Sequence, residues 1–413
     1  MLGALMAFPA LSIDMYLPAF PALAQDLQAT PGQVPYTLSA FFLGLALGQL
    51  LHGPLADRLG RKPPLLLGIL LYVLASLGCA MAPGIEALTA WRFLQAVGGC
   101  AGMVVARAVV RDLCEPTAAA RIFSWMMLVM GLAPILAPLG GGWLLELADW
   151  RAIFWFLAAF GLACLVAVTA LLPETLPPAG RVPLSPGGVA RVYGRLLQHR
   201  RFMAFALAGT CCSAGMFAYI AGSPHVFITL YGVPANQYGL YFGANAVGLI
   251  ALSQLNRGLV TRYGVEAVLG AGITGAALLG LVLWGCAWTG LGGFWGLLVP
   301  LFGYVAMMGL ISPNGMALAL GSQRSHHGQA SALLGTVQFT LATGSGLLVG
   351  ALPHHSARPM TTLMALFGLA GLTAFTLARR TAPDADPASR EGASGEESGA
   401  PAPGTPHAVA PGA

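Results

Sequence analysis

The stretch Gly53-Pro54-Leu55-Ala56-Asp57-Arg58-Leu59-Gly60-Arg61-Lys62-Pro63 decides the fold. It places four charged side chains and two glycines between two long apolar segments, in a chain where only 8% of residues are charged. A short, polar and basic turn between two segments of membrane length is typical of a cytoplasmic loop. The segments on both sides are therefore predicted to cross a bilayer.

The composition of the whole chain supports a membrane location. Hydrophobic residues make up 57% of the 413 positions, and an ordinary soluble protein carries about 25% charged residues. A soluble domain could not bury so much apolar surface, so most of it must face lipid or other helices. The net charge of +5 does not indicate a nucleic acid partner, because the basic residues are spread over alternate loops.

The cysteines predict neither a disulfide framework nor a metal site. There are seven, an odd number, and none is spaced as CxxC. Each lies within or close to an apolar segment, where cysteine behaves as a small hydrophobic residue. No motif for another cofactor was found, so no metal and no cofactor are expected.

Twelve segments are long and apolar enough to be transmembrane helices. Residues near the start of the chain could suggest a secretory signal, but no basic region precedes them and Asp14 and Pro18 interrupt the apolar run. We therefore interpret this stretch as the first helix. The predicted segments lie near residues 1–24, 36–56, 64–82, 88–110, 122–146, 150–172, 202–224, 237–256, 265–287, 294–318, 328–351 and 359–378.

The positive charges in the loops predict the orientation. The loops that follow the second, fourth, sixth, eighth and tenth segments carry most of the lysines and arginines. The loops on the other side of the membrane carry only Arg151 and Arg358. By the positive-inside rule both termini are cytoplasmic. The basic residues of the other loops and of the end of the last helix are Arg58, Arg61, Lys62, Arg111, Arg121, Arg181, Arg191, Arg195, Arg200, Arg201, Arg257, Arg262, Arg324, Arg379 and Arg380.

The long connection after the sixth segment divides the chain into two halves. We expect an N-terminal six-helix bundle at 1–175, a cytoplasmic linker at 176–201, a C-terminal six-helix bundle at 202–380 and a disordered cytoplasmic tail at 381–413. A weak internal repeat supports this division, since residues 55–60 (LADRLG) correspond to residues 259–264 (LVTRYG) at an offset of 204. Two parallel six-helix repeats are typical of one class of secondary transporter.

Several motifs resemble one known family. Residues 53–62 (GPLADRLGRK) are similar to the loop signature between the second and third helices of the major facilitator superfamily. Four further stretches resemble its Bcr/CflA branch of drug:proton antiporters. They are residues 12–18 (SIDMYLP), 106–112 (ARAVVRD), 130–138 (MGLAPILAP) and 219–224 (YIAGSP).

The resemblance implies a fold and a function. The fold would be all-α, with twelve transmembrane helices in two six-helix bundles. The chain would be no enzyme but a monomeric transporter in the bacterial inner membrane, exporting small-molecule drugs in exchange for protons. No phosphate-binding loop is present, so ATP is not the expected energy source. Two alternatives remain: export of a metabolite such as an amino acid, dipeptide or sugar, and a membrane sensor that has lost transport.

Asp14 is the only acidic residue well inside a predicted membrane segment. A carboxylate at this depth is costly to keep ionised, so it binds a proton readily or pairs with a cation. Both properties suit a group that alternates between a loaded and an empty state, and the resemblance implies this role. The alternative is a permanently protonated Asp14 that holds the first helix against its neighbours.

Arg92 is the second candidate for proton coupling. Arginine keeps its proton in proteins, so it cannot carry the transported one. It can favour the ionised form of a nearby carboxylate, and the resemblance implies that it tunes Asp14. Gln95 follows it as in the family's fourth-helix motif, although Ala96 stands where the family has glycine. The alternative is an arginine whose side chain extends to the outer membrane interface.

The turn at 53–63 is the third candidate. Asp57 is expected at the C-terminal end of a helix, where the helix dipole disfavours a carboxylate, so a partner elsewhere is predicted. The resemblance implies that this partner is the start of the eleventh helix, near residues 328–331. It also implies that Arg61 bridges to Asp112 and that Gly53 lets the second and eleventh helices approach closely.

Together with Arg58 and Gly60, these residues would form a latch that holds the cytoplasmic side closed. Only one such latch is expected, because Thr261 replaces the carboxylate in the repeat. The alternative is a turn that sets the orientation of the chain and does nothing more.

Polar and small residues complete the set of candidates. Pro134 and Pro138 would kink the fifth helix, and Gly141 and Gly142 would allow it to pack tightly. This pattern resembles the antiporter motif that lies between the two halves and limits leakage. Weaker candidates for the substrate cavity could equally be helix–helix hydrogen bonds. They are Tyr16, Gln95, Tyr219, Asn245, Asn314 and Gln338.

Overall fold

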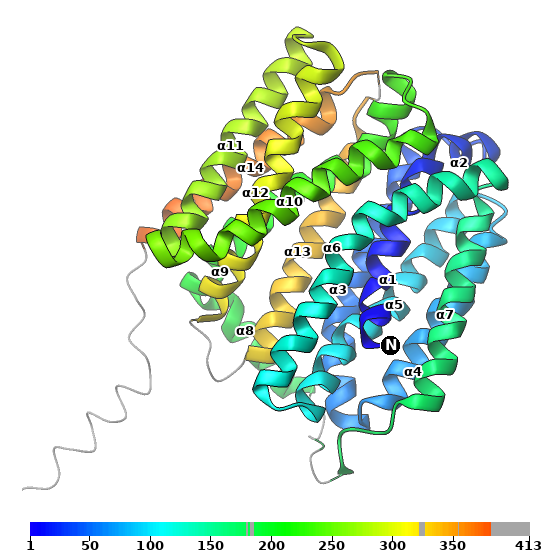
Figure 1. Ribbon diagram of the computed structural model, residues 1–413, viewed down its shortest axis with the longest axis vertical. Coiled ribbons are helices and arrows are strands. Elements are labelled where there is room, and N and C mark those ends of the chain that lie inside the picture. Colours follow the sequence, from blue (N-terminus) through cyan, green and yellow to red (C-terminus); the bar gives the residue numbers. More distant parts are fainter. Residues whose placement is uncertain (179–180, 182–185, 322–326, 354, 381–413) are drawn as a thin grey trace, which may run out of the picture.

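The computed structural model describes residues 1–178, 181, 186–321, 327–353 and 355–380. The predicted disordered tail at 381–413 lies outside the described residues. Within the described ranges the secondary structure is helical, and no strand is present. Figure 1 shows the long helices running roughly side by side.

The helices of the first half correspond to the first six predicted segments. They are α1 (Leu2–Asp14), η1 (Leu17–Ala19), α2 (Phe20–Asp26), α3 (Gln33–Leu59), α4 (Lys62–Ala80), α5 (Ile85–Leu113), α6 (Pro116–Leu147) and α7 (Arg151–Leu171). The first segment differs from the prediction, because it is interrupted instead of forming one helix. α1 ends at Asp14, and Pro18 and Pro21 begin the short elements that follow. Proline is favoured in the first turn of a helix because it lacks the N–H that would remain unpaired there.

The second half contains the other six predicted segments. Its elements are α9 (Arg200–Pro224), the π-helical η3 (His225–Leu230), α10 (Ala235–Tyr263), α11 (Val265–Thr289), α12 (Gly293–Gly321), α13 (His327–Ala351) and α14 (Arg358–Arg380). Eleven spans of the described chain are long and apolar enough to cross a membrane. α10, which covers the predicted segment 237–256, is 29 residues long but is not one of them. Its composition is more polar, with Asn245, Asn256 and Arg257 among its residues.

The predicted linker contains a helix that the sequence analysis missed. α8 (Pro186–Gln198) precedes α9 and packs against α9 and α13. Its exposed side chains include Arg191 and Arg195, whereas Leu196 is buried. This amphipathic pattern is typical of a helix at a surface.

The internal repeat appears in the structure as two equivalent turns. Gly60 ends α3 and Gly264 ends α10, and both have positive φ, at 94° and 82°. Residues other than glycine rarely adopt these backbone angles. The weak sequence repeat at an offset of 204 therefore marks corresponding turns of the two halves.

The halves contact each other mainly through two pairs of helices. α3 packs against α13, and α6 packs against α10. In Figure 1, α6 and α10 lie close together at the end that carries α2 and separate toward the opposite end. The opposite end carries the turn at 53–63. α6 and α10 therefore join the two halves at the α2 end and diverge toward the turn end.

Candidate functional site

Asp14 lies at the C-terminal end of α1, where the first segment is interrupted. It is 5% exposed. No hydrogen bond or ion pair connects its carboxylate to another described side chain, and it lies within electrostatic reach of Tyr219 and Tyr238 of the second half. Burial without a partner is unusual for a carboxylate, since burying an unpaired charge is costly. Asp14 is thus suited to hold and release a proton.

Two other predicted residues, Tyr219 and Asn245, belong to helices of the second half. The amide of Asn245 on α10 donates a hydrogen bond of 2.9 Å to the hydroxyl of Tyr219 on α9, and both side chains are buried. The carbonyl oxygen of that amide, Oδ1 of Asn245, is buried and has no hydrogen-bond partner among the described residues. It can therefore accept a hydrogen bond from a polar group of a substrate.

Arg92 is enclosed in the first half and does not extend to the outer interface. It is fully buried, and its Nη1 donates a 2.7 Å hydrogen bond to Gln95. Its Cζ lies 4.2 Å from the ring centre of Phe41 and 4.7 Å from that of Tyr16. Aromatic faces attract a guanidinium, most strongly where water is absent.

The structure does not pair Arg92 with Asp14. The groups that act electrostatically on Arg92 are Tyr16, Tyr72 and Cys79. Its Nε and Nη2 have no hydrogen-bond partner among the described residues. Tyr16, which contacts the guanidinium of Arg92, lies two residues along the chain from Asp14, and its hydroxyl hydrogen-bonds to Thr37 at 2.5 Å.

Arg61 joins the turn to the end of α5. Its Nη1 lies 2.5 Å from Asp57, and its Nε lies 2.8 Å from Asp112. The contact with Asp112 is the one that the resemblance implied. Asp57, by contrast, has its ion pair inside its own half, and its side chain is 57% exposed. Arg58 is exposed at the same end of α3, and Gly60 provides the positive φ that ends this helix.

The close approach predicted at Gly53 for a closed turn end is not made in this structure. A Cβ atom added there would meet no atom within 4 Å. α3 and α13 instead meet nearer the α2 end, where a Cβ at Gly335 would overlap Gln49 and where Thr336 donates a 3.3 Å hydrogen bond to the carbonyl of Ala46.

Glu174 is a functional candidate that the sequence analysis missed. It follows α7, and its Oε1 accepts a 2.8 Å hydrogen bond from the backbone N–H of Arg61. Its Oε2 accepts a 3.2 Å bond from the backbone N–H of Lys62, the first residue of α4. A carboxylate is favourable at the N-terminus of a helix. The only signal in the sequence was an acidic residue shortly after a predicted helix, which is too common to single out.

Glu174→Gln is expected to destabilise the protein by about 1 kcal/mol at pH 7, the usual effect of losing a helix cap. Burial favours the neutral acid, but the backbone N–H groups of Leu176, Arg61, Lys62 and Thr175 outweigh it and hold the pKa of Glu174 below its ordinary value of 4.5. The stabilisation is therefore present above about pH 4.5 and is lost as the pH falls through the lower, folded-state value.

The measurement is the thermal unfolding temperature of the purified protein in detergent at several pH values. Wild type and Glu174→Gln should differ at pH 7 and converge as the pH falls below the lowered pKa of Glu174 in the folded state. Arg191→Gln, which changes an exposed charged side chain within α8, serves as the control and should show no such pH-dependent difference from wild type. A difference between wild type and Glu174→Gln that grew on acidification would contradict the assignment.

The motif of α6 lies against both halves. Pro134 and Pro138 are inside α6. A Cβ at Gly141 would overlap the carbonyl of Met15, next to Asp14, and a Cβ at Gly142 would press on Asn236 of α10. One turn further along α6, Glu146 accepts a hydrogen bond from the side-chain amide of Asn236. This end of α6 therefore holds the two halves together at the α2 end.

The remaining cavity candidates divide into two groups. Gln95 belongs to the buried network of Arg92, since its amide donates a 2.8 Å hydrogen bond to Ser76. Asn314 connects α12 to α10 through a 2.7 Å hydrogen bond to Asn256, which is the helix–helix alternative. Gln338 is half-buried on α13. The structure thus joins Asn245 to Tyr219, which lies within electrostatic reach of Asp14, and assigns structural contacts to Gln95 and Asn314.

Comparison with known proteins agrees with this architecture. The family model of the Major Facilitator Superfamily matches residues 2–346. The chain belongs to this superfamily. A bicyclomycin resistance protein homolog of Haemophilus influenzae is 35% identical over 363 residues, covering 88% of this chain and 91% of the relative. The likeness to the Bcr/CflA branch that the motifs predicted is confirmed by relatives of this kind.

A second relative and one solved structure extend the comparison. A chloramphenicol resistance protein of Pseudomonas aeruginosa is 30% identical over 378 residues, covering 85% of this chain and 83% of the relative. The crystal structure of a D-xylose-proton symporter superposes with a TM-score of 0.71 at 15% identity, covering 93% of this chain and 97% of the symporter. The superfamily fold of two bundles is therefore confirmed, and the chain is a membrane transporter, not an enzyme.

Proposed function

We propose that this protein exports small amphipathic drugs across the bacterial inner membrane in exchange for protons. The observation that carries the proposal is the position of Asp14. Its carboxylate is buried, has no described partner and lies within electrostatic reach of Tyr219 of the other half. Its loaded and empty states therefore affect the contact between the halves directly. The names of the bicyclomycin and chloramphenicol resistance relatives support drugs as the substrates.

Export follows from rocking of the two halves, 1–175 and 202–380, around a site between them. At the α2 end the halves touch through Glu146 and Asn236. At the turn end, a Cβ atom added at Gly53 of α3 would meet no atom within 4 Å. A compound enters from the turn end, and protonation of Asp14 resets the transporter after release. Arg92 favours the ionised form of Asp14 through Tyr16.

The turn acts as the latch of the alternate state. Arg61 already holds Asp57 and Asp112 together within the first half. When the turn end closes, Asp57 exchanges part of this contact for the start of α13 near residues 328–331. The latch thus forms only in the state that opens the α2 end. The two helix pairs α3/α13 and α6/α10 open and close together. One chain can therefore carry out transport as a monomer.

The positively charged residues of the turn end indicate that this end lies in the cytoplasm. Arg58, Arg61 and Lys62 lie at that end, as do the two arginines that end α14. Arginine and lysine are retained on the cytoplasmic side during insertion. Both termini are then cytoplasmic, and the α2 end faces the periplasm.

A drug-susceptibility panel tests the proposal. The chain is expressed in a bacterium that lacks its own efflux pumps, and growth is measured with and without a protonophore. We expect resistance to several amphipathic drugs and its loss when the proton gradient is dissipated. Proton release on adding a drug to proteoliposomes, compared with amino acids, dipeptides and sugars, identifies the substrate class. Resistance that survives the protonophore would reject proton coupling.

A further inference from the structure

A cavity of roughly 310 Å³ lies between the two halves at the α2 end. α2 and the start of α3 form one wall, and α9, η3, the end of α13 and the start of α14 form the other. Its size is at the lower limit of small-molecule binding sites, about 300–1,000 Å³. None of the candidate residues described above lines it, so it is separate from the site around Asp14.

The inner part of the cavity is apolar. Val34, Ala221, Val349 and Met360 line it, and all four are buried. Below this floor, Phe42, Phe217 and Phe339 form a cluster from α3, α9 and α13, with ring centres 4.8–6.4 Å apart. We call these three rings the aromatic plug.

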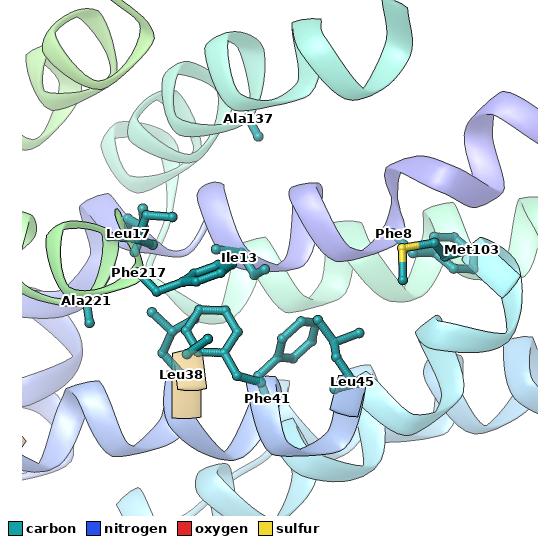
Figure 2. Close-up of a cluster of buried hydrophobic side chains, with 14 of the residues drawn as sticks. Phe8, Ile13, Leu17, Leu38, Phe41, Leu45, Met103, Ala137, Phe217 and Ala221 are labelled. Atoms are coloured by element: carbon teal, nitrogen blue, oxygen red, sulfur yellow. The ribbon is translucent and has the colours of Figure 1, made fainter. Parts of the chain in front are cut away.

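The plug lies next to the end of α1. Figure 2 shows Phe217 between Leu17 and Leu38, close to Ile13, with Ala221 one helical turn away on α9. Leu38 in turn lies one turn from Val34 of the floor along α3. The plug therefore separates the cavity from the middle of the molecule.

The outer part of the cavity is polar and open. Gln25 and Thr229 line the mouth and are exposed, and His225 and Ser356 add two further polar side chains. No aspartate, glutamate, lysine or arginine is among the described lining residues. An apolar floor beneath an uncharged polar mouth fits a neutral compound with an apolar body and one polar end. A charged compound would lose its hydration there without gaining a partner.

One wall of the cavity has an unusual backbone. His225, Val226 and Thr229 belong to η3, the π-helical turn that continues α9. Such turns are rare and occur frequently at functional sites. They widen the helix locally, which lets the wall adjust to occupants of different shape. This second observation also indicates a binding surface.

We propose that this cavity is an exit-side binding site for a small neutral amphipath, whose apolar body rests on the floor and whose hydroxyl or amide groups contact the mouth. The inference rests on the proposed export function and adds to it a second site on the same path. Both halves supply walls, so an occupant holds the α2 end closed. An exported compound at high external concentration therefore inhibits its own export.

Chloramphenicol is a suitable probe, because it is neutral and carries an aromatic ring together with hydroxyl and amide groups. Equilibrium dialysis of radiolabelled chloramphenicol with the purified full-length protein should show two molecules bound per chain. Thr229→Trp covers the mouth and Ala221→Phe fills the floor, so each should reduce the number to one. The exposed residue Leu291 lies at the same end outside the cavity, and Leu291→Trp should retain two.

Thr229 is exposed, so the protein should tolerate Thr229→Trp. This variant therefore tests the site even if Ala221→Phe does not fold. One molecule or none bound to wild type, or two bound to Thr229→Trp, would overturn the second site. Failure of the export function gives a different result, namely no pH-gradient-driven transport of any panel compound in vesicles. Self-inhibition by external chloramphenicol in wild type, relieved at least two-fold in Thr229→Trp, is the matching transport result.

Discussion

Asp14→Asn is expected to abolish proton-driven export while leaving the protein in the membrane. Asparagine has the shape of the protonated acid but cannot take up or release a proton. No described hydrogen bond or ion pair of Asp14 is lost, so folding should be unaffected. We expect the rate of drug transport driven by a pH gradient in everted vesicles to fall at least about ten-fold, which corresponds to about 1.4 kcal/mol.

The control is Asp149→Asn, which changes an exposed carboxylate at the same end of the molecule. Its transport should equal that of wild type. Asp14→Asn should also still bind drug, because the protonated form that it mimics belongs to the normal cycle. Full resistance in cells expressing Asp14→Asn would reject the coupling role, and loss of the protein from the membrane would favour the structural alternative.

The fold was largely predictable from the sequence, because length and hydropathy alone determine which segments can cross a bilayer. The predicted segments match the positions of the long helices, and the predicted turn lies within 53–63, although only Gly60 and Arg61 separate α3 from α4. The interruption after Asp14 was harder to predict, since prolines are tolerated within membrane helices when neighbours satisfy the freed backbone groups. Likewise, α8 is short and polar, so hydropathy does not distinguish it from the surrounding linker.

The site was predictable in its residue types but not in its pairings. Asp14 and Arg92 were both recognisable as charges in apolar sequence, and their coupling seemed the simplest arrangement. The structure surrounds Arg92 with Tyr16 and Phe41 instead. An aromatic environment for a cation gives no local sequence pattern, because Phe41 comes from another helix.

The turn illustrates the same limit. Arg61 forms an ion pair with Asp112, as the resemblance implied. The carboxylate that accepts hydrogen bonds from the backbone N–H groups of Arg61 and Lys62 belongs to Glu174, which is more than 100 residues away in the sequence. The role of Gly53 was inferred for a state in which α3 and α13 meet at the turn end. That contact is not made at Gly53 here, and a contact that depends on the conformational state could not be predicted from sequence alone.

Gly141→Ala is expected to have the second large effect, because α6 and the end of α1 touch at this point without space for a methyl group. The added Cβ would overlap the carbonyl oxygen of Met15 and crowd its Cα, which lies 3.0 Å away. All the crowded atoms belong to the backbone, so neither helix can yield by changing a side-chain rotamer. Overpacking of this kind costs about 1–3 kcal/mol.

The adjacent glycine provides a matched control. A Cβ at Gly140 would meet only the Cε of Met15, at an ordinary distance of 3.8 Å. Alanine is also favoured over glycine inside a helix by about 1 kcal/mol. Gly140→Ala should therefore keep or raise the thermal unfolding temperature in detergent, whereas Gly141→Ala should lower it.

The same pair of variants separates packing from transport. Met15 follows Asp14, so the shift forced by Gly141→Ala displaces the carboxylate from Tyr219 and should reduce pH-gradient-driven transport several-fold among the molecules that remain folded. Transport must be normalised to the amount of folded protein, measured by size-exclusion chromatography. If Gly141→Ala and Gly140→Ala transported equally well, the contact between α6 and Met15 would have no part in positioning Asp14. The proton site would then depend on α1 and the second half alone.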